Sequence, residues 1–398
     1  MIKILIVTTF EIKGGSFRSL TTLVDGLKDT IDFKVNVLTQ KIRNKHLGFF
    51  GIDSYLSIFS IIKNIVSFKP DVIITQLNIS FPTIIISKIM KVPVINIVRG
   101  TSEFCPKYVD IIEYGKICSG LNNRKQCFKC INKWRSLRVL IGNKRKGWEY
   151  SLPSAISNIL YKIRYFICKF NLNLLKKASV NLVASNLMKK NITNRIQSNV
   201  KIVNITPINK RLIDTFTLIS CADGTVVGKE KRLIFVMPTD DASYKGLDFV
   251  LKLIRFIPKD YHIFIIGGYI PSYKLSWDAT KLWIMGYIHS NKLLNTFYYE
   301  STITLVPTFS TEAFGRTVLE SLVNRTPVIS SPQCGINEFL KDDFLQVVPL
   351  KLDLWIKKIE DMIKNPPTIT NDDISKIYEQ FSLEKNKQDF IKIIKKVK

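Results

Sequence analysis

The chain has 398 residues, of which 46% are hydrophobic and 23% are charged. This length exceeds what one hydrophobic core usually supports, so we expect two domains. The formal net charge of +27 indicates an anionic partner such as a phosphorylated substrate, acidic lipid or nucleic acid, although a basic proteome would explain part of it. Three histidines are present, which argues against mechanisms that need a histidine triad or several histidine ligands.

Apolar runs rich in β-branched residues alternate with amphipathic segments along the first half of the chain. Near-continuous hydrophobic strands that alternate with helices are typical of a parallel sheet covered on both faces. We expect strands at 2–9, 33–40, 70–77, 92–100, 179–185 and 199–205, helices at 81–91 and 154–178, and a further helix after the glycine pair that follows the first strand. A cysteine-rich, basic insertion interrupts the pattern at about 101–153.

The second half of the chain repeats the alternation. We expect strands at 232–238, 261–268, 281–288, 302–307 and 326–331, helices at 245–257 and 291–301, and an amphipathic terminal helix over 379–398. A polar segment at 206–231 joins the two halves. The sequence therefore predicts an α/β protein with two doubly wound domains in series.

Two acids, Glu312 and Glu320, stand eight residues apart after the strand predicted at 302–307. Ligands of open α/β sheets bind at the carboxyl ends of the strands, and a helix that begins near Arg316 would point its amino terminus at that place. Eight residues is a little over two helical turns, so we expect both acids to face one side, about 12 Å apart along the axis. That separation exceeds the distance between the paired carboxylates of glycoside hydrolases, so we expect two hydrogen-bonding groups for one elongated ligand.

The segment "PTFSTEAFGRTVLESL", which contains both acids, resembles the E-x7-E motif of the family 4 retaining glycosyltransferases, whose fold is GT-B. The segments "KGLDFVLKLI", "IFIIGG", "IMGYI" and "RTPVISS" follow that family's order, as do "GGSFRSL", "KPDVII" and the terminal "FSLEK". The resemblance covers nearly the whole chain and is most specific in its second half. It implies two Rossmann-like domains that face a central cleft: an acceptor-side domain at 1–207, a nucleotide-sugar domain at 208–380 and a terminal helix at 381–398 that crosses back.

The resemblance also implies a role for each matching residue. Glu320 would bind the ribose of a nucleotide-sugar donor, and Glu312 the hydroxyls of the transferred sugar, beside the backbone N–H groups of Phe314 and Gly315. Lys245 would neutralise the donor diphosphate, so Lys245 and Glu312 are the candidate catalytic residues. Finally, two glycines of the first domain would let its backbone approach the phosphates: Gly14 and Gly15.

The chain departs from the family's pattern at three places. Met237, Pro238 and Thr239 stand where relatives carry a Gly-Arg pair, so a second cation for the diphosphate would have to come from a residue such as Arg316. Arg99 replaces a histidine of the first domain, and Arg325 holds the place of a helix-ending glycine. These departures leave the expected fold unchanged.

By this resemblance the protein transfers a hexose from a nucleotide diphosphate sugar to a glycan or lipid-linked acceptor with retention of configuration. No cofactor would be required for catalysis, because Lys245 and helix amino termini supply positive charge. One alternative is a degenerate, non-catalytic GT-B protein that binds polyanionic glycan or nucleic acid, with nucleic acid the less favoured partner. A nucleotide-sugar epimerase of the same fold is disfavoured because histidine is scarce.

Four cysteines cluster in the insertion: Cys105, Cys118, Cys127 and Cys130. Four thiolates with one C-x2-C arm could close a structural zinc site, although the spacing is irregular. Disulfides and ordinary thiols are the alternatives that the sequence leaves open. In each case we expect these residues to hold the insertion together rather than to take part in chemistry.

Basic and aromatic residues are interleaved between 133 and 169. This mixture suits an anionic membrane surface, where aromatic rings sit among lipid headgroups, and it would also suit single-stranded nucleic acid or a solvated face. No uncharged apolar run is long enough to span a bilayer, and no signal peptide is evident. We therefore expect a cytoplasmic protein that docks peripherally on the inner face of the membrane.

Overall fold

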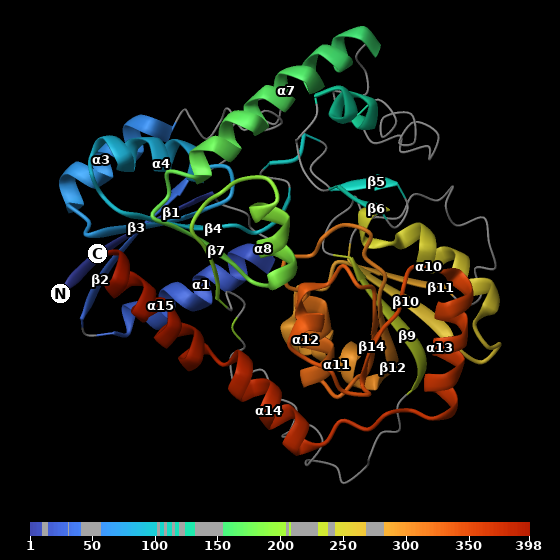
Figure 1. Cartoon of the computed structure of the whole chain (residues 1–398). Helices are drawn as coiled ribbons and strands as arrows, with labels where there is room; N and C mark the ends of the chain where they lie inside the picture. Colours follow the sequence, from blue (N-terminus) through green and yellow to red (C-terminus); the bar gives the residue numbers. More distant parts are fainter. Residues whose placement is uncertain are drawn as a thin grey trace. The chain divides into compact units, whose positions relative to one another are not determined.

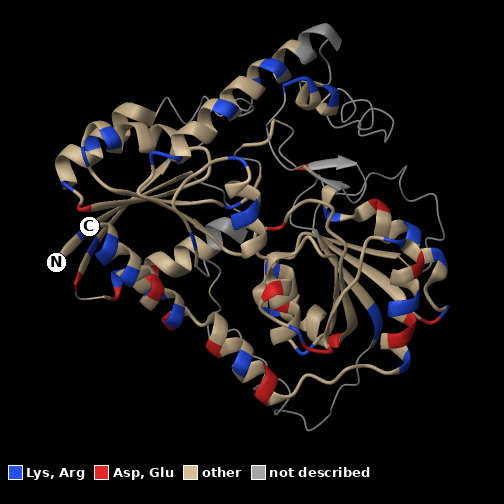
Figure 2. Ribbon diagram, viewed as in Figure 1, with Lys and Arg blue, Asp and Glu red and all other residues tan. Residues whose placement is uncertain are grey.

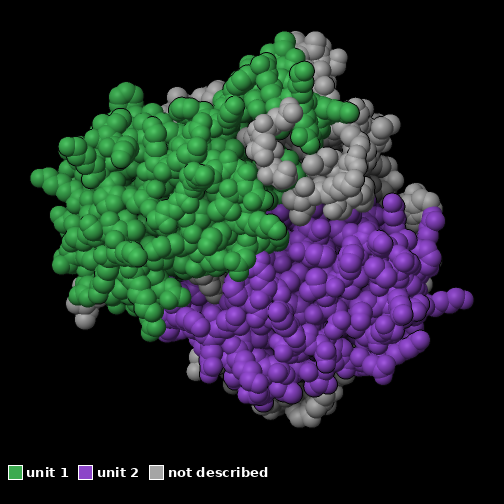
Figure 3. Space-filling view, in the orientation of Figure 1, with its two compact units in different colours: residues 1–205, 387–398 green, residues 206–386 purple. Residues whose placement is uncertain are grey.

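The computed structural model describes residues 1–9, 15–30, 32–40, 57–101, 104–106, 110–113, 116–118, 124–131, 154–203, 207, 230–237, 243–267 and 282–398. The chain divides into two compact units (Figure 3). Unit 1 comprises Met1–Ile205 and Lys387–Lys398, and unit 2 comprises Thr206–Asn386. Of the segments discussed above, residues 132–153 and 208–229 lie outside the described part of the chain.

Unit 1 is built on a six-stranded sheet with the strand order β2-β1-β3-β4-β7-β8 (Figure 1). All neighbouring strands in it are parallel. The interior of β1 and all of β3, β4 and β7 are buried, as expected of β-branched apolar strands covered by helices on both faces. The strands are β1 (Ile2–Thr9), β2 (Phe33–Gln40), β3 (Val72–Gln76), β4 (Val94–Ile97), β7 (Val180–Val183) and β8 (Val200–Ile202).

Helices cover both faces of this sheet, with α1 and α15 on one face and α3 and α4 on the other (Figure 1). Within the region predicted as an insertion, the structure describes the antiparallel pair β5 (Ile111–Glu113) and β6 (Lys116–Ile117) and a helix at 124–131. Arg164 Nε donates a hydrogen bond to Pro106 O at 2.9 Å and Arg195 Nη2 donates one to Cys118 O at 3.0 Å, so a helix and a turn of unit 1 fasten this region. The helices are α1 (Gly15–Lys28), α3 (Ile58–Phe68), α4 (Ser80–Ile89), α7 (Ser154–Leu175) and α8 (Asn186–Thr193).

Unit 2 contains a second six-stranded parallel sheet, with the order β11-β10-β9-β12-β13-β14. The chain builds outward from β9 to β11, then returns to place β12 on the other side of β9. This reversal is the topological switch point at which doubly wound sheets bind ligands. The strands are β9 (Glu230–Met237), β10 (His262–Gly267), β11 (Leu282–Gly286), β12 (Ser301–Val306), β13 (Val328–Ser330) and β14 (Leu345–Val347). The two sheets confirm the predicted α/β architecture.

The connections of unit 2 are mostly helical. They are the 3-10 turns η3 (Ser243–Lys245), η4 (Ile254–Phe256) and η7 (Gly335–Glu338) and the helices α10 (Leu247–Leu253), α11 (Asn291–Glu300), α12 (Arg316–Val323), α13 (Leu352–Lys364) and α14 (Asn371–Phe381), which α15 (Leu383–Val397) follows. The predicted terminal helix is confirmed as α15, but the expected start at 379 is wrong, because α14 and α15 are separated at Ser382. Its backbone is extended, with φ −61° and ψ 154°, and its hydroxyl accepts a hydrogen bond from the backbone N–H of Lys385 at 3.3 Å.

Among the residues that the structure describes, no helix is long and apolar enough to cross a bilayer.

Candidate functional site

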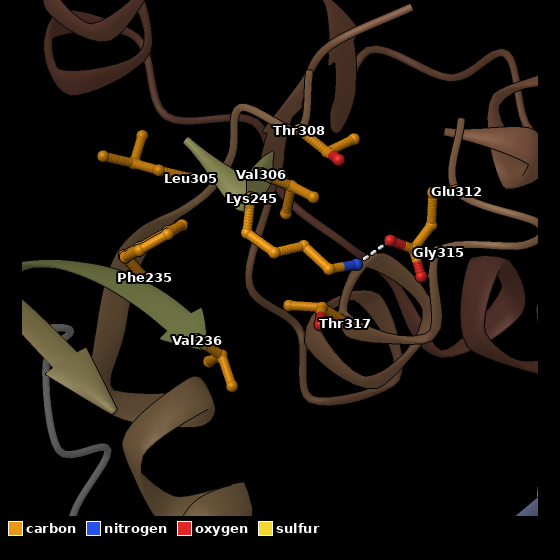
Figure 4. Close-up of a pocket in the computed structure, with 9 residues that line it drawn as sticks. All are labelled: Phe235, Val236, Lys245, Leu305, Val306, Thr308, Glu312, Gly315 and Thr317. Atoms are coloured by element: carbon orange, nitrogen blue, oxygen red, sulfur yellow. Dashed lines mark hydrogen bonds and ion pairs between the residues drawn. The ribbon is translucent and has the colours of Figure 1, made fainter. Parts of the chain in front are cut away.

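A pocket lies at the switch point of unit 2, where β9 and β12 run side by side (Figure 4). The last residues of both strands form one wall, and the segment that leads into α12 forms the other. Figure 4 shows the side chain of Lys245 reaching toward Glu312 within this pocket. The lining residues are Phe235, Val236, Lys245, Leu305, Val306, Thr308, Glu312, Gly315 and Thr317.

Lys245 is placed by the backbone that follows it. Gly246 caps α10 with φ +92°, and a Cβ at this position would lie 2.2 Å from Pro307 O, so only glycine fits so closely against the end of β12. The contact is reinforced because Phe309 N donates to Tyr244 O at 2.9 Å. Residues far apart in sequence are thereby locked together, with Lys245 between them.

The ammonium of Lys245 is partly buried and pairs with Glu312. The two side chains are 17% and 28% exposed, and Lys245 Nζ donates to Glu312 Oε2. Burial lowers the pKa of Lys245 from its ordinary value of 10.5 to about 8, while the neighbouring Cys334 acts in the opposite direction. A partly desolvated ammonium attracts an anion such as a phosphate, and the carboxylate that it releases can accept hydrogen bonds from hydroxyl groups.

Glu312 lies in the loop before α12, not on the helix. Its backbone forms an isolated parallel bridge with Cys334, in which Glu312 N donates to Gln333 O at 2.9 Å and Gly335 N donates to Glu312 O at 3.1 Å. The expectation that Glu312 and Glu320 share one helical face is therefore wrong, and so is the axial distance derived from it. The separation argument against a glycosidase falls with it. What the structure shows is that each acid is held by a cation.

The next two residues fix the entry into α12. Gly315 is the N-cap with φ +102°, and a Cβ there would lie 3.1 Å from Ile336 Cγ2. Phe314 is buried, and its ring packs edge-on against Phe381 at 5.4 Å and more loosely against Phe339. The aromatic contacts anchor the loop, and Gly315 turns it so that the amino terminus of α12 meets the pocket.

Glu320 lies one turn further along α12 and does not line the pocket itself. Arg316 Nε donates to Glu320 Oε1 at 2.6 Å, and Tyr298 OH donates to Glu320 Oε2 at 3.4 Å. Thr317, which lines the pocket, is three residues from Glu320 and adjacent to it on the helix surface. Burial and the Glu320 charge raise the pKa of the fully buried Tyr298, so its hydroxyl remains a hydrogen-bond donor.

The structure thus brings Lys245, Glu312 and Gly315 together in one pocket, with Phe314 and Glu320 beside it. Gly15 is the first residue of α1 in unit 1, and Gly14 lies outside the described residues. Arg316, the residue suggested as a second cation for the diphosphate, is paired with Glu320. The side chains of Met237, Pro238 and Thr239 lie outside the described part of the chain.

Sequence reasoning missed two contributors to the site. Tyr298 comes from α11, and Cys334 comes from the loop after β13, where it forms the backbone bridge with Glu312. No motif signals either residue, because both reach the site only through the packing of elements that are distant along the chain.

Arg325 adopts φ +57°, the left-handed conformation that favours glycine at the end of a helix. Its guanidinium donates to Ile369 O at 3.1 Å and to the side chain of Asn371. These bonds tie the end of α12 to the start of α14 and offset the strain of a side chain in this conformation.

Arg99, at which the sequence resemblance implied a histidine, lies at the carboxyl edge of the unit 1 sheet. Its Nε donates to Gln76 Oε1 at 2.7 Å, and Gln76 Nε2 donates to Thr8 Oγ1 at 3.0 Å. The three side chains form a polar chain across the ends of β4, β3 and β1.

The four cysteines predicted as zinc ligands gather in unit 1. Burial raises the pKa of Cys127 to about 12, with smaller contributions from Cys118, Cys105 and Cys130, so all three lie within electrostatic range of it. They are thiols, which disfavours the disulfide alternative. Within the described part of the chain, however, no three or more His, Cys, Asp or Glu side chains are arranged to hold a metal ion. Zinc binding stays a prediction that metal analysis of the purified protein tests.

Residues 225–397 match the family model of the group 1 glycosyl transferases. No curated protein matches the sequence. The whole chain is similar in structure to HepE of Anabaena in complex with UDP and glucose, with 12% identity, a TM-score of 0.64 and 100% of each chain covered.

Two further solved structures share this similarity. Sucrose-phosphate synthase of Thermosynechococcus elongatus has 11% identity and a TM-score of 0.67 over 100% of this chain and 99% of its own. The UDP-GlcNAc 2-epimerase of Methanocaldococcus jannaschii has 12% identity and a TM-score of 0.51 over 99% of each chain. At these identities the similarity establishes the fold, GT-B, as the sequence predicted, and leaves the reaction to be argued from the site.

Proposed function

We propose that the protein is a glycosyltransferase that moves a hexose from a nucleotide diphosphate sugar to a hydroxyl of a glycan or lipid-linked acceptor, with retention of configuration. The observation that carries this proposal is the partly buried Lys245–Glu312 pair at the switch point of unit 2, next to the amino terminus of α12. A cation and a helix amino terminus suit a diphosphate, and a carboxylate suits sugar hydroxyls. The match of residues 225–397 to the group 1 glycosyl transferases supports the same conclusion.

Each residue of the pair would bind a different half of the donor, Lys245 the diphosphate and Glu312 the sugar. When a diphosphate enters, Lys245 can turn its ammonium toward the phosphate oxygens, and Glu312 is then available to accept hydrogen bonds from the sugar. Because the backbone N–H and carbonyl of Glu312 are both hydrogen-bonded, its backbone keeps its place when the lysine moves, and the carboxylate stays at the pocket. The site would hold the donor so that the bond to be cleaved, between the anomeric carbon and the phosphate oxygen, lies at the pocket.

Bond cleavage places a new negative charge on the leaving nucleoside diphosphate. Lys245 and the amino terminus of α12 would stabilise that charge, which is the main catalytic contribution we assign to this chain's residues. The acceptor oxygen then bonds to the anomeric carbon on the face that the diphosphate leaves, and its proton passes to a diphosphate oxygen. This route needs no enzymic nucleophile, which fits a pocket in which Glu312, the one carboxylate among the described lining residues, is paired with lysine.

Glu320 would hold the ribose hydroxyls. Tyr298 and Arg316 bind one carboxylate oxygen each, so the carboxylate is oriented before a ligand arrives. Each oxygen retains lone pairs for a ribose hydroxyl. We therefore treat Tyr298 as a positioning residue for Glu320.

The first test is binding of nucleoside diphosphates and nucleotide sugars, beginning with UDP and UDP-glucose and followed by the other bases. A ligand present at about 100 times its Kd adds about 2.7 kcal/mol to stability, which a thermal-shift assay detects. We expect one nucleotide to bind wild type and to lose affinity in Glu320→Gln. The anomeric configuration of the product, followed by NMR with the donor so identified, then tests transfer with retention.

A non-catalytic GT-B protein is the second candidate. The observation that favours it is that both acids already have cationic partners within the chain, and that Met237-Pro238-Thr239 stands where relatives carry a glycine and an arginine. Binding of heparin or nucleic acid with steep salt dependence, together with no stabilisation by any nucleotide, would establish this alternative and overturn the transferase proposal.

A further inference from the structure

The helix α7 of unit 1 has an apolar stripe on its solvent side. The exposed fractions are 54% for Ile159, 45% for Ile163, 50% for Phe166 and 52% for Phe170. These residues recur at intervals of four, three and four, so they lie along one side of the helix, over about 16 Å. Single exposed apolar residues are ordinary, but a continuous row of four large ones indicates a surface that contacts something.

The opposite side of α7 already packs on the protein. Tyr165, Cys168, Leu172 and Leu175 are buried there, together with Arg164. The exposed stripe is therefore not the core-facing side of the helix. An ordinary surface helix has one apolar side and one polar side, whereas α7 has two apolar sides.

The helices around the stripe carry positive charge and no negative charge. Neither α3, α4 nor α7 contains an aspartate or glutamate. Figure 2 shows blue segments on these three helices and no red, and α4 packs against both α3 and α7. On the other face of the sheet, acids do occur, with Asp25 in α1 and Asp389 in α15.

Lysines and cation–π contacts border the stripe directly. Lys162 and Lys169 are exposed, and their positions place them along one edge of the row. Arg124 lies 5.2 Å from the ring centroid of Phe166, and Lys162 lies 5.8 Å from that of Phe128. The same layer has three further exposed apolar side chains on α3 and α4: Phe59, Val66 and Ile89.

We infer that α7, with the outer sides of α3 and α4, docks unit 1 on an anionic membrane surface. Phenylalanine and isoleucine side chains enter the boundary between headgroups and acyl chains, and lysines beside them reach the phosphates. The absence of acids from the three helices removes the repulsion that an anionic surface would otherwise meet. A protein partner of this surface would need a matching acidic and apolar groove, whereas an anionic bilayer provides both features without a specific shape.

This inference is independent of the donor site, because every residue that carries it belongs to unit 1 and the donor pocket belongs to unit 2. It bears on the proposed function in one respect. A unit 1 held at a bilayer would favour the lipid-linked class of acceptor over free glycan.

The test is flotation of the full chain with vesicles of phosphatidylcholine alone and of phosphatidylcholine mixed with phosphatidylglycerol. We expect binding to the anionic vesicles that weakens with added salt. Phe166→Ala/Phe170→Ala should lower the partition at least about tenfold, since the apolar anchor is lost. Lys162→Glu/Lys169→Glu should lower it at least about 25-fold, because each lysine near an anionic surface contributes about fivefold.

Matched controls exist in unit 2. Lys357→Glu/Lys364→Glu makes the same charge change at the same seven-residue spacing on another exposed helix. Phe256→Ala/Leu293→Ala removes two apolar side chains of similar exposure. Both controls should bind vesicles like wild type. Phe170→Trp gives an independent readout, since brominated lipid should quench its added fluorescence relative to wild type.

Three results would overturn the inference. The first is equal binding to neutral and anionic vesicles, or none to either. The second is loss of binding in the controls to the same extent as in the α7 variants. The third is a change of molecular mass in solution when Phe166 and Phe170 are replaced, because the stripe would then be a contact between two copies of the chain.

Discussion

Replacing Lys245 by methionine should change the pH dependence of stability in a direction that the structure fixes. The lysine keeps its charge in the folded state at neutral pH although it is largely withdrawn from water, and this burial lowers its pKa from 10.5 to about 8. A difference of that size corresponds to about 3 kcal/mol of destabilisation of the charged form, because one pKa unit is worth about 1.4 kcal/mol. Methionine has a similar length and no charge, so Lys245→Met removes this penalty.

The sign follows from proton binding. Below pH 8 the lysine is protonated in both the folded and unfolded states, and the penalty is fully present in wild type. Between pH 8 and 10.5 the folded state releases the proton while the unfolded state keeps it, so wild type gains stability as the pH rises. The gain between about pH 7 and about pH 10 amounts to about 2.5 kcal/mol.

The assay is calorimetry of wild type and Lys245→Met without ligand across this pH range. The Tm of wild type minus that of the variant should increase by roughly 5–10 °C, since about 1 kcal/mol shifts Tm by 2–4 °C in a domain of this size. Lys364→Met, at an exposed position on α13, is the control and should show a constant difference. A constant or falling difference for Lys245→Met would refute the reasoning, because it would mean that the Glu312 carboxylate outweighs burial.

The same titration predicts how ligand binding depends on pH. A nucleoside diphosphate meets a cationic Lys245 below about pH 8 and a neutral amine above it. We expect the Kd for the diphosphate to rise as the pH passes through 8, and to lose that dependence in Lys245→Met. Calorimetric titration at several pH values measures it, and a pH-independent Kd in wild type would place the diphosphate away from this lysine.

Three further substitutions test the architecture of the site. Gly246→Ala should destabilise unit 2 by at least about 3 kcal/mol in denaturant unfolding, because left-handed strain adds to a backbone clash. Its control, Gly100→Ala, has open space around the new Cβ and should be nearly neutral. Equal effects of the two substitutions would contradict the packing described. Tyr298→Phe removes one hydrogen bond to Glu320 and should weaken nucleotide binding about 3- to 10-fold while sugar selectivity is kept; unchanged binding would show that Glu320 needs no positioning. The Arg325→Gly variant should be more stable than the Arg325→Ala variant by about 1 kcal/mol. Both variants lose the same hydrogen bonds, and only glycine relieves the strain of the left-handed backbone. An alanine variant of equal stability would contradict this reasoning.

The sequence alone was sufficient for the α/β class and for most of the elements. Strands such as β1 and β3 are short β-branched runs buried on both faces, and such runs are recognisable without knowledge of their neighbours. The segment from Glu312 to Glu320 was also recognisable, because its loop, glycine and helix are contiguous along the chain. The error about the helical spacing of the two acids arose at an element boundary, where a loop and a first helical turn have similar composition.

The tertiary structure decided what lies next to what. Lys245 and Glu312 are 67 residues apart, and they meet because the chain returns from β11 to place β12 beside β9. Tyr298 reaches Glu320 from a different helix, and the apolar stripe of α7 is distinguishable from its core-facing side only when the neighbours of each residue are known. Local sequence fixes local conformation through steric and hydrophobic patterns, whereas ion pairs, burial and shifted pKa values depend on distances that exist only after the sheet has assembled.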